Sequence, residues 1–515
     1  MSYLLGIDVG TTSIKCALYD VERGVEKAIY SSRVSLYSPQ EGWAEQDMLE
    51  IWKKTCRLLS QLTKHFNPED IISIGLSGQS SGLWLVDKKL MPVRMGITWL
   101  DLRGKEVITD LSEEQLQKLY DITCWKIFPG SGPILLKWIH DNESSSFKKV
   151  KYVLRCKDWV RLKLTDIVCS DFTDMIGFVD PKRMQYSEEV FEILGLDKSY
   201  IDLLPQLKSS WNVIGEVSMQ AAKETGLKAG TPVVCGAYDV CSSALGAGVI
   251  EEGQFFLILG TAGIYASVSK SIMRDPSRIV SINAHTVPGA YIMNSQSMLA
   301  TPILDWFINE FCKDLKTSAQ KTTSVYDLCD ESVRNVKRGV SGLIFLPFLQ
   351  GEMSPFMNPR ARGVIFGISL TSSRDEFLRS IYEAIGFSAL DNISYLSRLL
   401  RIVPKSITVI GGGARSKVWP QILADIMGSK IIIPKGKEFG CRGAAINAGV
   451  GIGIYKNHKE GLTRFYGIGR EIYPNEKKTK IYRSYFSLYR KLYRTIWSLW
   501  DELEKVNKLV QSHHN

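Results

Sequence analysis

A carboxylate interrupts the first apolar run of the sequence. Asp8 lies within residues 4–9, and a second apolar run follows at residues 14–18, after a turn of Gly10, Thr11 and Thr12. Because an unpaired buried carboxylate is costly, we expect a cation to compensate Asp8. The backbone N–H groups and hydroxyls of the turn, with Lys15 beyond it, could hold phosphate oxygens while Asp8 faces a magnesium ion through water. An ordinary β-hairpin with a capped turn is the alternative.

A second carboxylate follows a predicted strand. Residues 233–235 form a short apolar run that breaks at Gly236, and a helix of small residues is expected to begin at Asp239. A carboxylate at the carboxyl end of a strand is well placed to take a proton from a substrate. Asp239 could equally be a simple helix N-cap, and the local sequence does not separate the two interpretations.

Two polar segments could bind a hydroxyl-rich ligand. A buried strand at residues 71–76 leads to Gln79, Ser80 and Ser81, which precede a second strand at residues 83–87. Small and amide residues between two strands suit a polar pocket wall, although a plain polar turn is equally consistent. At residues 97–103 we predict an extended segment with Asp101 and Arg103 on one face. This pair could bind sugar hydroxyls or could be a structural ion pair.

The second half of the chain repeats the first pattern without the aspartate. An apolar run at residues 255–259 leads into Gly260 and Thr261, which predicts a duplicated domain with a second phosphate-facing turn. A third turn, with Gly412, Gly413 and Ala414, follows a β-branched run and permits close approach of the backbone to a bulky ligand. A helix is expected over residues 416–427. The sequence contains neither the P-loop motif nor the dinucleotide-binding glycine motif.

Composition limits the class of protein. The chain has 515 residues, of which 45% are hydrophobic and 23% charged, so we expect at least two large globular domains. The net charge of +10 is spread along the chain, which favours anionic ligands but does not indicate nucleic acid. The ten cysteines and six histidines show neither disulfide nor zinc-site spacing. No apolar run is long enough to cross a membrane and we expect no cleavable leader, so we predict a cytoplasmic protein.

The C-terminal region contains an aromatic stripe among basic residues. Its aromatic members recur at helical spacing: Tyr482, Phe486, Tyr489, Tyr493, Trp497 and Trp500. A basic aromatic helix could bind a membrane surface or nucleic acid. We favour the alternative, a terminal helix that packs its aromatic side chains on the core and keeps its arginines in water.

Residues 3–454 resemble the FGGY family of carbohydrate kinases. The most specific segment is 363–383, which fits the second signature of the family at every defined position, and residues 345–363 are close to the xylulokinase and gluconokinase branch. Residues 130–142 match the earlier signature in part, since they keep Trp138 and Asn142 but have Gly132 and Leu135 at other positions of the pattern.

This resemblance implies an α/β fold with two actin-like, ribonuclease H-like ATPase domains that flank a catalytic cleft. Residues 1–245 would form the sugar-binding and catalytic domain, and residues 246–515 the nucleotide-binding domain. Asp239 would be the catalytic base and Asp8 would hold magnesium. The nucleotide would be bound by Gly10, Thr11, Thr12, Lys15, Gly260, Thr261, Gly412, Gly413 and Ala414. The sugar would be bound by Gln79, Ser80, Ser81, Asp101, Arg103 and Asp239.

The implied function is an ATP-dependent carbohydrate kinase that uses ATP and Mg2+ and transfers the γ-phosphate to a hydroxyl group. Typical xylulokinases have Met-His where this chain has Ser80 and Ser81, and the segment is closer to L-xylulose and erythritol-type kinases. We therefore expect a xylulose-type pentulose, with an erythritol- or glycerol-type polyol kinase or a gluconokinase as the alternative. From other classes, an actin-like ATPase scaffold and a non-catalytic sugar sensor remain. The expected partners are the sugar or polyol and ATP, without nucleic acid or membrane, and a homodimer is the assembly to test.

Overall fold

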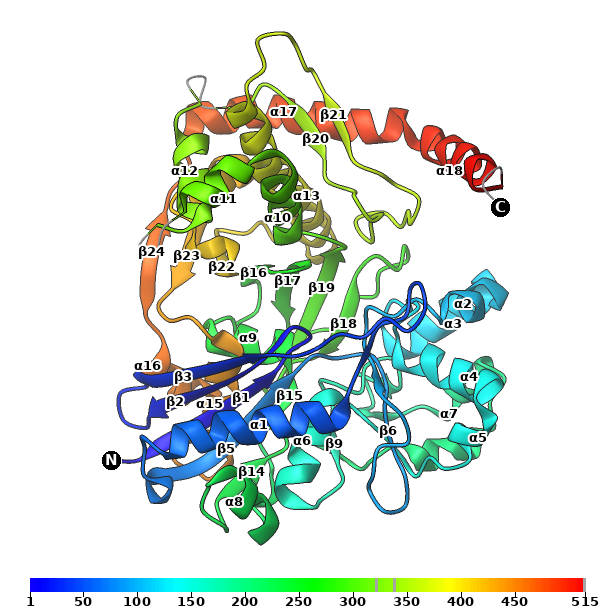
Figure 1. Ribbon diagram of the computed structural model, residues 1–515, viewed down its shortest axis with the longest axis vertical. Coiled ribbons are helices and arrows are strands. Elements are labelled where there is room, and N and C mark those ends of the chain that lie inside the picture. Colours follow the sequence, from blue (N-terminus) through cyan, green and yellow to red (C-terminus); the bar gives the residue numbers. More distant parts are fainter. Residues whose placement is uncertain (320–322, 337–339, 513–515) are drawn as a thin grey trace. The chain divides into compact units, whose positions relative to one another are not determined.

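The computed structural model describes residues 1–319, 323–336 and 340–512, which form two compact units (Figure 1). Unit 1 comprises Met1–Glu252, Val268–Ile292 and Gly436–Gly467. Unit 2 comprises Gly253–Ser267, Met293–Lys435 and Ile468–Asn515. This partition follows spatial proximity, whereas the division predicted at residues 245 and 246 concerns family domains and stays a prediction.

The sheet of unit 1 is a mixed sheet with the strand order β13-β14-β5-β1-β2-β3. Its strands are β1 (Tyr3–Val9), β2 (Ser13–Asp20), β3 (Glu26–Arg33), β5 (Ile71–Gly78), β13 (Val213–Glu216) and β14 (Pro232–Val234). Strands β1, β5 and β14 run parallel, and β15 (Ala237–Tyr238) pairs in parallel with the last residues of β5. The predicted hairpin is confirmed, because β1 and β2 pair antiparallel with Asp8 directly opposite Lys15.

The alternation of β1 sends its side chains to two different faces of the sheet. Leu5, Ile7 and Val9 enter a hydrophobic cluster with helices on one face. These helices are α1 (Met48–Thr63), α6 (Cys156–Thr165) and α8 (Met219–Thr225). Leu4 packs on the other face with α9 (Asp239–Gly246) and α15 (Phe439–Gly451). Because side chains alternate along a strand, Asp8 faces the same side as Leu4.

Helix α15 approaches the sheet at backbone distance. A Cβ atom added to Gly6 or Gly75 would lie 1.9 Å from the carbonyl oxygen of Cys441 or Ala444, respectively. Such distances leave no room for any side chain, so glycine at both strand positions is what allows α15 to seat on β1 and β5.

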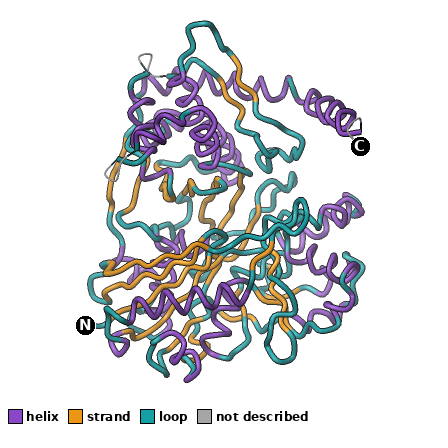
Figure 2. Tube along the Cα trace, viewed as in Figure 1, coloured by secondary structure: helices purple, strands orange, loops and turns teal. Residues whose placement is uncertain are grey.

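A second hydrophobic cluster of unit 1 surrounds Leu135 and Phe178, within the part of the chain between β5 and β14. Its helices and their neighbours are α2 (Lys105–Asp110), α3 (Glu113–Thr123), α4 (Gly132–Asn142), α5 (Ser144–Phe147) and α7 (Glu188–Ile193). Short strands accompany them, among which β4 (Glu45–Gln46) pairs with β7 (Gly96–Ile97), and β6 (Trp84–Val86) pairs with β8 (Tyr152–Leu154). Figure 2 shows how much of this region is loop and helix.

The extended segment predicted over residues 97–103 is wrong. Strand β7 ends at Ile97, and the following residues turn back, with the N–H of Asp101 donating to the carbonyl of Thr98 at 3.2 Å. The Asp101 carboxylate then accepts the backbone N–H of Arg103 at 2.9 Å. An aspartate that bonds the backbone two residues on forms a local turn, which competes with extension of the strand.

The sheet of unit 2 repeats the core arrangement of unit 1. Its strands β19 (Tyr291–Ser297), β17 (Gly263–Ser269), β16 (Phe255–Leu259), β22 (Ser406–Gly411), β23 (Lys430–Pro434) and β24 (Ile468–Ile472) are neighbours in that order. In unit 1, β1 pairs antiparallel with β2 and parallel with β5. In the same way, the central strand β16 of unit 2 pairs antiparallel with β17 and parallel with β22. The main helices are α10 (Thr301–Phe311), α12 (Val325–Arg334), α13 (Arg374–Leu400) and α14 (Trp419–Met427).

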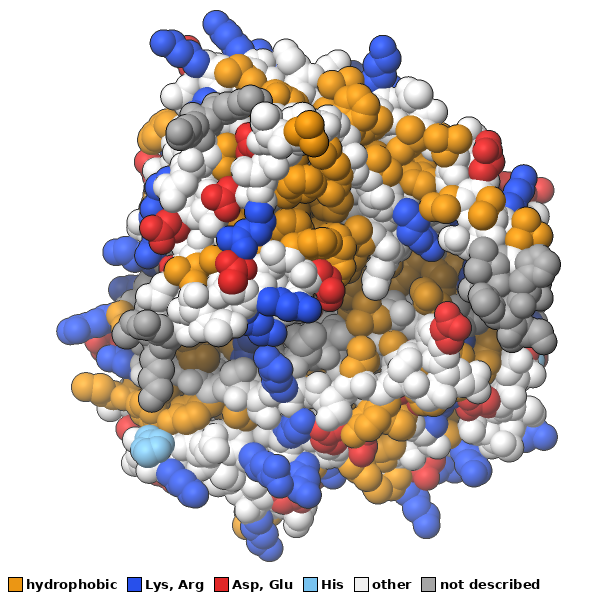
Figure 3. All heavy atoms as spheres, turned by 45° about the horizontal axis from the view of Figure 1, so that its top comes forward, with side chains coloured by type: hydrophobic (Ala, Val, Ile, Leu, Met, Phe, Trp, Pro, Cys, Tyr) orange, Lys and Arg blue, Asp and Glu red, His pale blue; other side chains and the backbone are white. Residues whose placement is uncertain are grey.

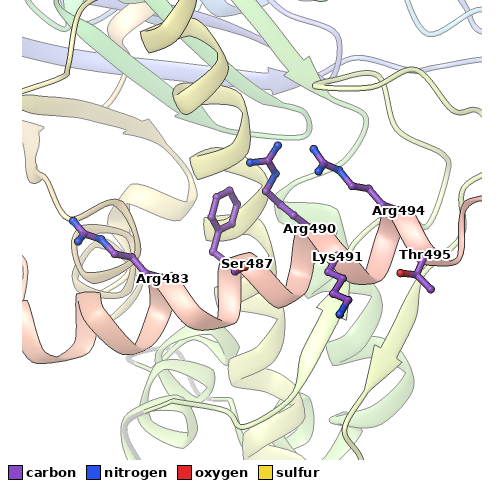
Figure 4. A pocket seen from close by; sticks show the side chains of 7 residues that line it. Arg483, Ser487, Arg490, Lys491, Arg494 and Thr495 are labelled. Carbon is purple, nitrogen blue, oxygen red and sulfur yellow. The ribbon is translucent and has the colours of Figure 1, made fainter.

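The chain ends in helices α17 (Glu476–Thr495) and α18 (Trp497–Ser512). Tyr482, Tyr489, Tyr493 and Trp500 are buried and Phe486 is half-buried, which confirms the predicted packing for most of the aromatic stripe, whereas Trp497 is 37% exposed. Figure 4 shows Arg483, Arg490 and Arg494 along one side of α17, where they line a surface hollow of about 520 Å³. Arg483 and Arg494 are exposed, as predicted, whereas Arg490 pairs with Asp391 at 3.4 Å.

Positive charge is dispersed over one face of the molecule. On the face shown in Figure 3, Lys and Arg side chains lie singly or in small groups. Among the described residues, none of the helices is both long enough and apolar enough to span a bilayer.

The close approach of α15 gives a stability prediction. Gly75→Ala would place a Cβ against the carbonyl of Ala444, so we expect a loss of about 3 kcal/mol in the free energy of unfolding. Gly289→Ala is the matched control, because Gly289 has φ +72° but no atom within 4 Å of an added Cβ, and we expect a loss of about 1 kcal/mol. Urea unfolding of both variants tests this, and equal losses would contradict the packing account.

Candidate functional site

The predicted site residues of unit 1 lie at one edge of its sheet. In the parallel pairings, Val9 of β1 and Tyr238 of β15 both align with Gly78 of β5. The segments that follow these strands are the turn of residues 10–12, the segment from Gln79 to Ser81, and Asp239. Because parallel strands end at the same edge, the fold gathers three segments that are far apart in sequence. In open α/β sheets this edge is the usual place for a ligand.

Asp8 is held by groups from three elements. Ser77 Oγ of β5 donates to Asp8 Oδ1 at 2.8 Å, and Lys15 stands opposite on β2. Asp8 Oδ2 lies against the first turn of α15, where a Cβ on Gly440 would come within 2.8 Å. The positive end of a helix favours a carboxylate at this place. Burial raises the pKa of Asp8, while the charge of Lys15 and the bond from Ser77 act in the opposite direction.

Lys15 is shared between two carboxylates. Its Nζ lies 2.7 Å from Glu438 Oε2, at the start of α15. Burial alone would lower the pKa of Lys15, but Asp8 and Glu438 raise it above its ordinary value. Lys15 therefore stays cationic, which supplies the compensation that the sequence predicted for Asp8.

Asp239 is the first residue of α9 and is half-buried. Tyr238 occupies the N-cap position without a side-chain capping bond, so the N-cap interpretation of Asp239 is wrong. Burial raises the pKa of Asp239 well above its usual range, and the charges of Asp8 and Asp174 raise it further. A carboxylate whose charged form is disfavoured in this way binds a proton more strongly, which is the property a general base needs.

The polar wall after β5 is buried. Gln79, Ser80 and Ser81 are 1%, 5% and 4% exposed, and Ser80 Oγ donates to the carbonyl of Asp174 at 3.1 Å. Ser81 adopts a left-handed conformation with φ 58°, which is uncommon for a residue other than glycine. The strained backbone at Ser81 turns the chain immediately after the wall residues.

Asp101 and Arg103 form a buried, bidentate ion pair. Arg103 Nε and Nη2 each donate to one Asp101 oxygen at 2.8 Å, and Nη2 also contacts Glu45 Oε1 at 2.5 Å. The guanidinium stacks 3.7 Å above the Trp43 ring. Among the described residues, Arg103 Nη1 has no hydrogen-bond partner, so it is the atom of this pair that is left for a ligand hydroxyl. A sugar-binding role for the pair stays a prediction.

A charged cluster behind the site was not identified from the sequence. Lys157 is fully buried, and its Nζ lies 2.7 Å from Asp158, 2.9 Å from Asp171 and 3.1 Å from Asp174. Thr173, next to Asp174, accepts the backbone N–H of Tyr238 at 2.9 Å, which ties the cluster to the residue before Asp239. The run of Lys157 and Asp158 and the run from Asp171 to Asp174 were visible in the sequence. Their shared burial depends on tertiary packing.

Unit 2 gathers its predicted nucleotide residues in the same way. Leu259 of β16 pairs in parallel with Gly411 of β22, so Gly260, Thr261 and the segment from Gly412 to Ala414 leave neighbouring strand ends. Thr301 at the start of α10 donates its N–H and Oγ to the carbonyl of Gly260 at 3.0 and 2.8 Å. The Ala414 carbonyl accepts Arg470 Nη2 at 2.6 Å. Both turns are thus fixed by side chains of their own unit.

The residues around Asp8 suit a metal ion that is bound partly by the protein and partly by the phosphates of a substrate. No cluster of three or more His, Cys, Asp or Glu side chains in the described part of the chain suits a metal ion by itself. Magnesium in phosphoryl-transfer sites commonly keeps several waters and uses one or two carboxylates with substrate phosphates. Asp8, a half-buried carboxylate near the end of β1, can supply the carboxylate that such a site uses.

The fold and these strand-edge turns define a class: α/β proteins with two actin-like ATPase domains. The chain belongs to the FGGY family of carbohydrate kinases, because residues 3–246 match the N-terminal domain of that family and residues 256–452 match the C-terminal domain. It is therefore a carbohydrate kinase. The family implies ATP as the phosphoryl donor with a divalent metal.

Known relatives cover nearly the whole chain. The sequence is 29% identical over 495 residues to an L-xylulose/3-keto-L-gulonate kinase of Escherichia coli, which covers 95% of this chain and 96% of the relative. It is 29% identical over 500 residues to a xylulose kinase of the same organism, covering 96% and 99%. A crystal structure of a xyloylose kinase from Brucella ovis matches with a TM-score of 0.85 and 26% identity, covering 96% and 100%.

The Lys157 cluster gives a pH prediction. Burial raises the pKa of Asp174 to about 6, with the charge of Lys157 acting against it. Since the folded state binds this proton more strongly, the stability contribution is complete below about pH 4 and is lost as the pH rises to about 6. Asp174→Asn should abolish this loss, so the stability of the wild type relative to the variant should fall by about 3 kcal/mol from pH 4 to pH 7.

Urea unfolding at a series of pH values measures this difference. The matched control is Asp202→Asn, because Asp202 is an exposed carboxylate of the same unit. A stability difference between wild type and Asp174→Asn that stays constant with pH would contradict the assignment.

Proposed function

We propose that this chain transfers the γ-phosphate of ATP to a hydroxyl of a xylulose-type pentulose, with Asp239 as the catalytic base and Mg2+ as the metal. The observation that carries the proposal is the position of Asp239 at the start of α9, at the sheet edge from which the turn of residues 10–12 also leaves. The transfer needs a group that accepts the proton of the attacking hydroxyl and backbone groups that bind phosphate, and this edge of the sheet carries a candidate for each.

The chemistry depends on positioning and on balancing charge. Phosphoryl transfer has a loose transition state, so the groups that hold the phosphates contribute more than the base does. Backbone N–H groups of Thr11 and Thr12 would face the phosphates, with Lys15 as the nearby cation, while the N–H of Gly10 closes the turn by donating to the carbonyl of Ser13 at 3.0 Å. When bound, magnesium would neutralise phosphate charge, and Asp8 would hold it through water. Asp239 would receive the proton of the attacking hydroxyl.

In unit 2, we assign Gly260 and Thr261 to the phosphates and Gly412, Gly413 and Ala414 to the adenosine. Support comes from the glycine at each turn, since an added Cβ on Gly412 would have its nearest neighbour only at 4.0 Å, and the backbone is open to a ligand.

The choice of a pentulose rests on the relatives and on the polar wall. An L-xylulose/3-keto-L-gulonate kinase and a xylulose kinase are both similar over nearly the full length. Ser80 and Ser81 are small and hydroxylated, so they leave room for a polyhydroxylated substrate, and we assign Gln79, Asp101 and Arg103 to the same substrate. A cytoplasmic location and a homodimer remain predictions from the sequence.

An erythritol- or glycerol-type polyol kinase or a gluconokinase remains the alternative within the family. A scaffold ATPase would need neither the buried pair of Asp101 and Arg103 nor Asp239. Purified protein with magnesium and ATP, assayed for ADP release against ketopentoses, tetritols, glycerol and gluconate, separates these functions. We expect the largest kcat/KM with a xylulose isomer, and a preference for another class of acceptor would overturn the pentulose assignment.

Loss of the base should remove turnover and leave nucleotide binding intact. We expect Asp239→Ala to lower kcat by about 10²- to 10⁴-fold, because a positioned base contributes that range. The Kd for ATP should stay within about threefold, since the variant retains every phosphate-facing group. Asp202→Ala, at an exposed site, is the control and should keep normal kcat. Near-normal turnover in Asp239→Ala would contradict the assignment of Asp239 as the catalytic base.

A further inference from the structure

Three side chains of unit 1 close a ring of hydrogen bonds. Thr11 Oγ1 donates to Gln79 Oε1 at 2.9 Å, and Gln79 Nε2 donates to Gln46 Oε1 at 2.7 Å. Gln46 Nε2 then donates to the backbone carbonyl of Thr11 at 2.7 Å, which returns to the first residue. A fourth bond enters from outside, because Trp99 Nε1 donates to Thr11 Oγ1 at 2.9 Å.

The ring joins segments that the sequence separates widely. Thr11 lies in the turn between β1 and β2, Gln79 follows β5, and Gln46 is the last residue of β4. Gln46 and Gln79 are 0% and 1% exposed, so the bond between them forms away from water, whereas the two bonds to Thr11 are partly buried. Hydrogen bonds in such surroundings are stronger than in water, and leaving one unmade is costly.

The direction of every bond is determined. Each amide of the two glutamines uses its oxygen as an acceptor and its nitrogen as a donor within the ring. If the Gln46 amide were flipped, its oxygen would face the carbonyl oxygen of Thr11 and its nitrogen would face the amide nitrogen of Gln79. The ring therefore admits one arrangement of the two amides.

The ring also limits what Thr11 can do for a ligand. A threonine hydroxyl has one proton, and Thr11 gives it to Gln79. Its hydroxyl is then unable to donate to a phosphate oxygen, whereas Thr12 is exposed. The contribution of Thr11 to an anion is thereby confined to its backbone N–H, whose orientation depends on how the turn is held.

We propose that Gln46 is a positioning residue that locks the phosphate turn to the sugar wall, so that occupancy of the wall by a sugar is coupled to binding of the nucleotide phosphates. This inference rests on the proposed function, since that function assigns Thr11 to phosphate and Gln79 to the sugar. Gln46 acts through Thr11 and Gln79: the oxygen and one N–H of its amide bond within the ring, and its side chain is 0% exposed. Trp99 supports the same turn through its hydrogen bond to the Thr11 hydroxyl.

The test compares coupling in the wild type, Gln46→Ala and Trp99→Phe. Calorimetry measures the factor by which a saturating non-hydrolysable ATP analogue tightens binding of the preferred sugar. Typical couplings between sites are about 5- to 150-fold. We expect Gln46→Ala to reduce this coupling factor toward one. We also expect the ratio of the ADP release rate without sugar to the rate with sugar to rise by about tenfold in this variant.

Two further variants make the outcome specific. Thr225→Val removes a buried hydroxyl bond on α8, where Thr225 Oγ1 donates to the Ala221 carbonyl at 2.6 Å, and should leave the coupling factor unchanged. Trp99→Phe keeps an aromatic ring and removes only the bond to Thr11, so it should lower the factor even where Gln46→Ala fails to fold.

Different results would overturn the role of Gln46 and the proposed kinase function. If the wild type couples sugar and nucleotide and both Gln46→Ala and Trp99→Phe behave like Thr225→Val, the positioning role is overturned while the kinase stands. If the wild type releases no ADP in response to any sugar, the proposed function is wrong and the inference falls with it.

Discussion

Parallel pairing of β1, β5 and β15 is the constraint on which the site of unit 1 depends. Three strands that end at one edge deliver Asp8, the wall from Gln79 to Ser81, and Asp239 to a common region. The same geometry concentrates negative charge, since Asp8 and Asp174 both act on Asp239. Carboxylates that share a site disfavour one another's charged forms, so a cation must accompany them.

Two lysines meet this need in different ways. Lys157 is fully buried among Asp158, Asp171 and Asp174, where its charge offsets the charges of these carboxylates. Lys15 is partly exposed and is shared between Asp8 and Glu438. The first arrangement fixes the backbone near Asp239 through Thr173 and Tyr238, whereas the second leaves a cation at the surface of the site. Removing either lysine would leave carboxylates without their counter-charge.

Close backbone packing holds these charges in register. A Cβ on Gly443 of α15 would lie 1.9 Å from the carbonyl of Ser242 in α9, and one on Gly6 would lie 1.9 Å from that of Cys441. Helices α9 and α15 therefore approach each other and the sheet without intervening side chains. Asp239 begins one of these helices, and the first turn of the other faces Asp8. Helix N-termini favour anions, so the packing that secures the fold also brings the ends of two helices to these carboxylates.

The sequence by itself determined the local parts of this protein. Periodicity and turn residues were sufficient for the hairpin around Gly10 and for the start of α9 at Asp239, because each depends on neighbours within a few residues. Periodicity also predicted that Tyr482 and Tyr489 face the core, although their partners, such as Glu383 and Phe387, are distant in the sequence. The family motifs added the two-domain fold and the carbohydrate kinase activity. The segment from Ile97 to Arg103 was mispredicted as extended, since the turn made by Asp101 outweighed its apolar start.

Only the tertiary structure decided which residues meet. Asp101 and Arg103 proved to be paired with each other and with Glu45, and the Lys157 cluster and the ring through Gln46 appeared only when distant segments packed together. Local spacing left the pairing of Asp101 with Arg103 as one of two open interpretations, and it carries no information on the contacts between distant segments. They arise from strand order and from burial, which force polar groups of separate segments to satisfy one another because no water is present to do so.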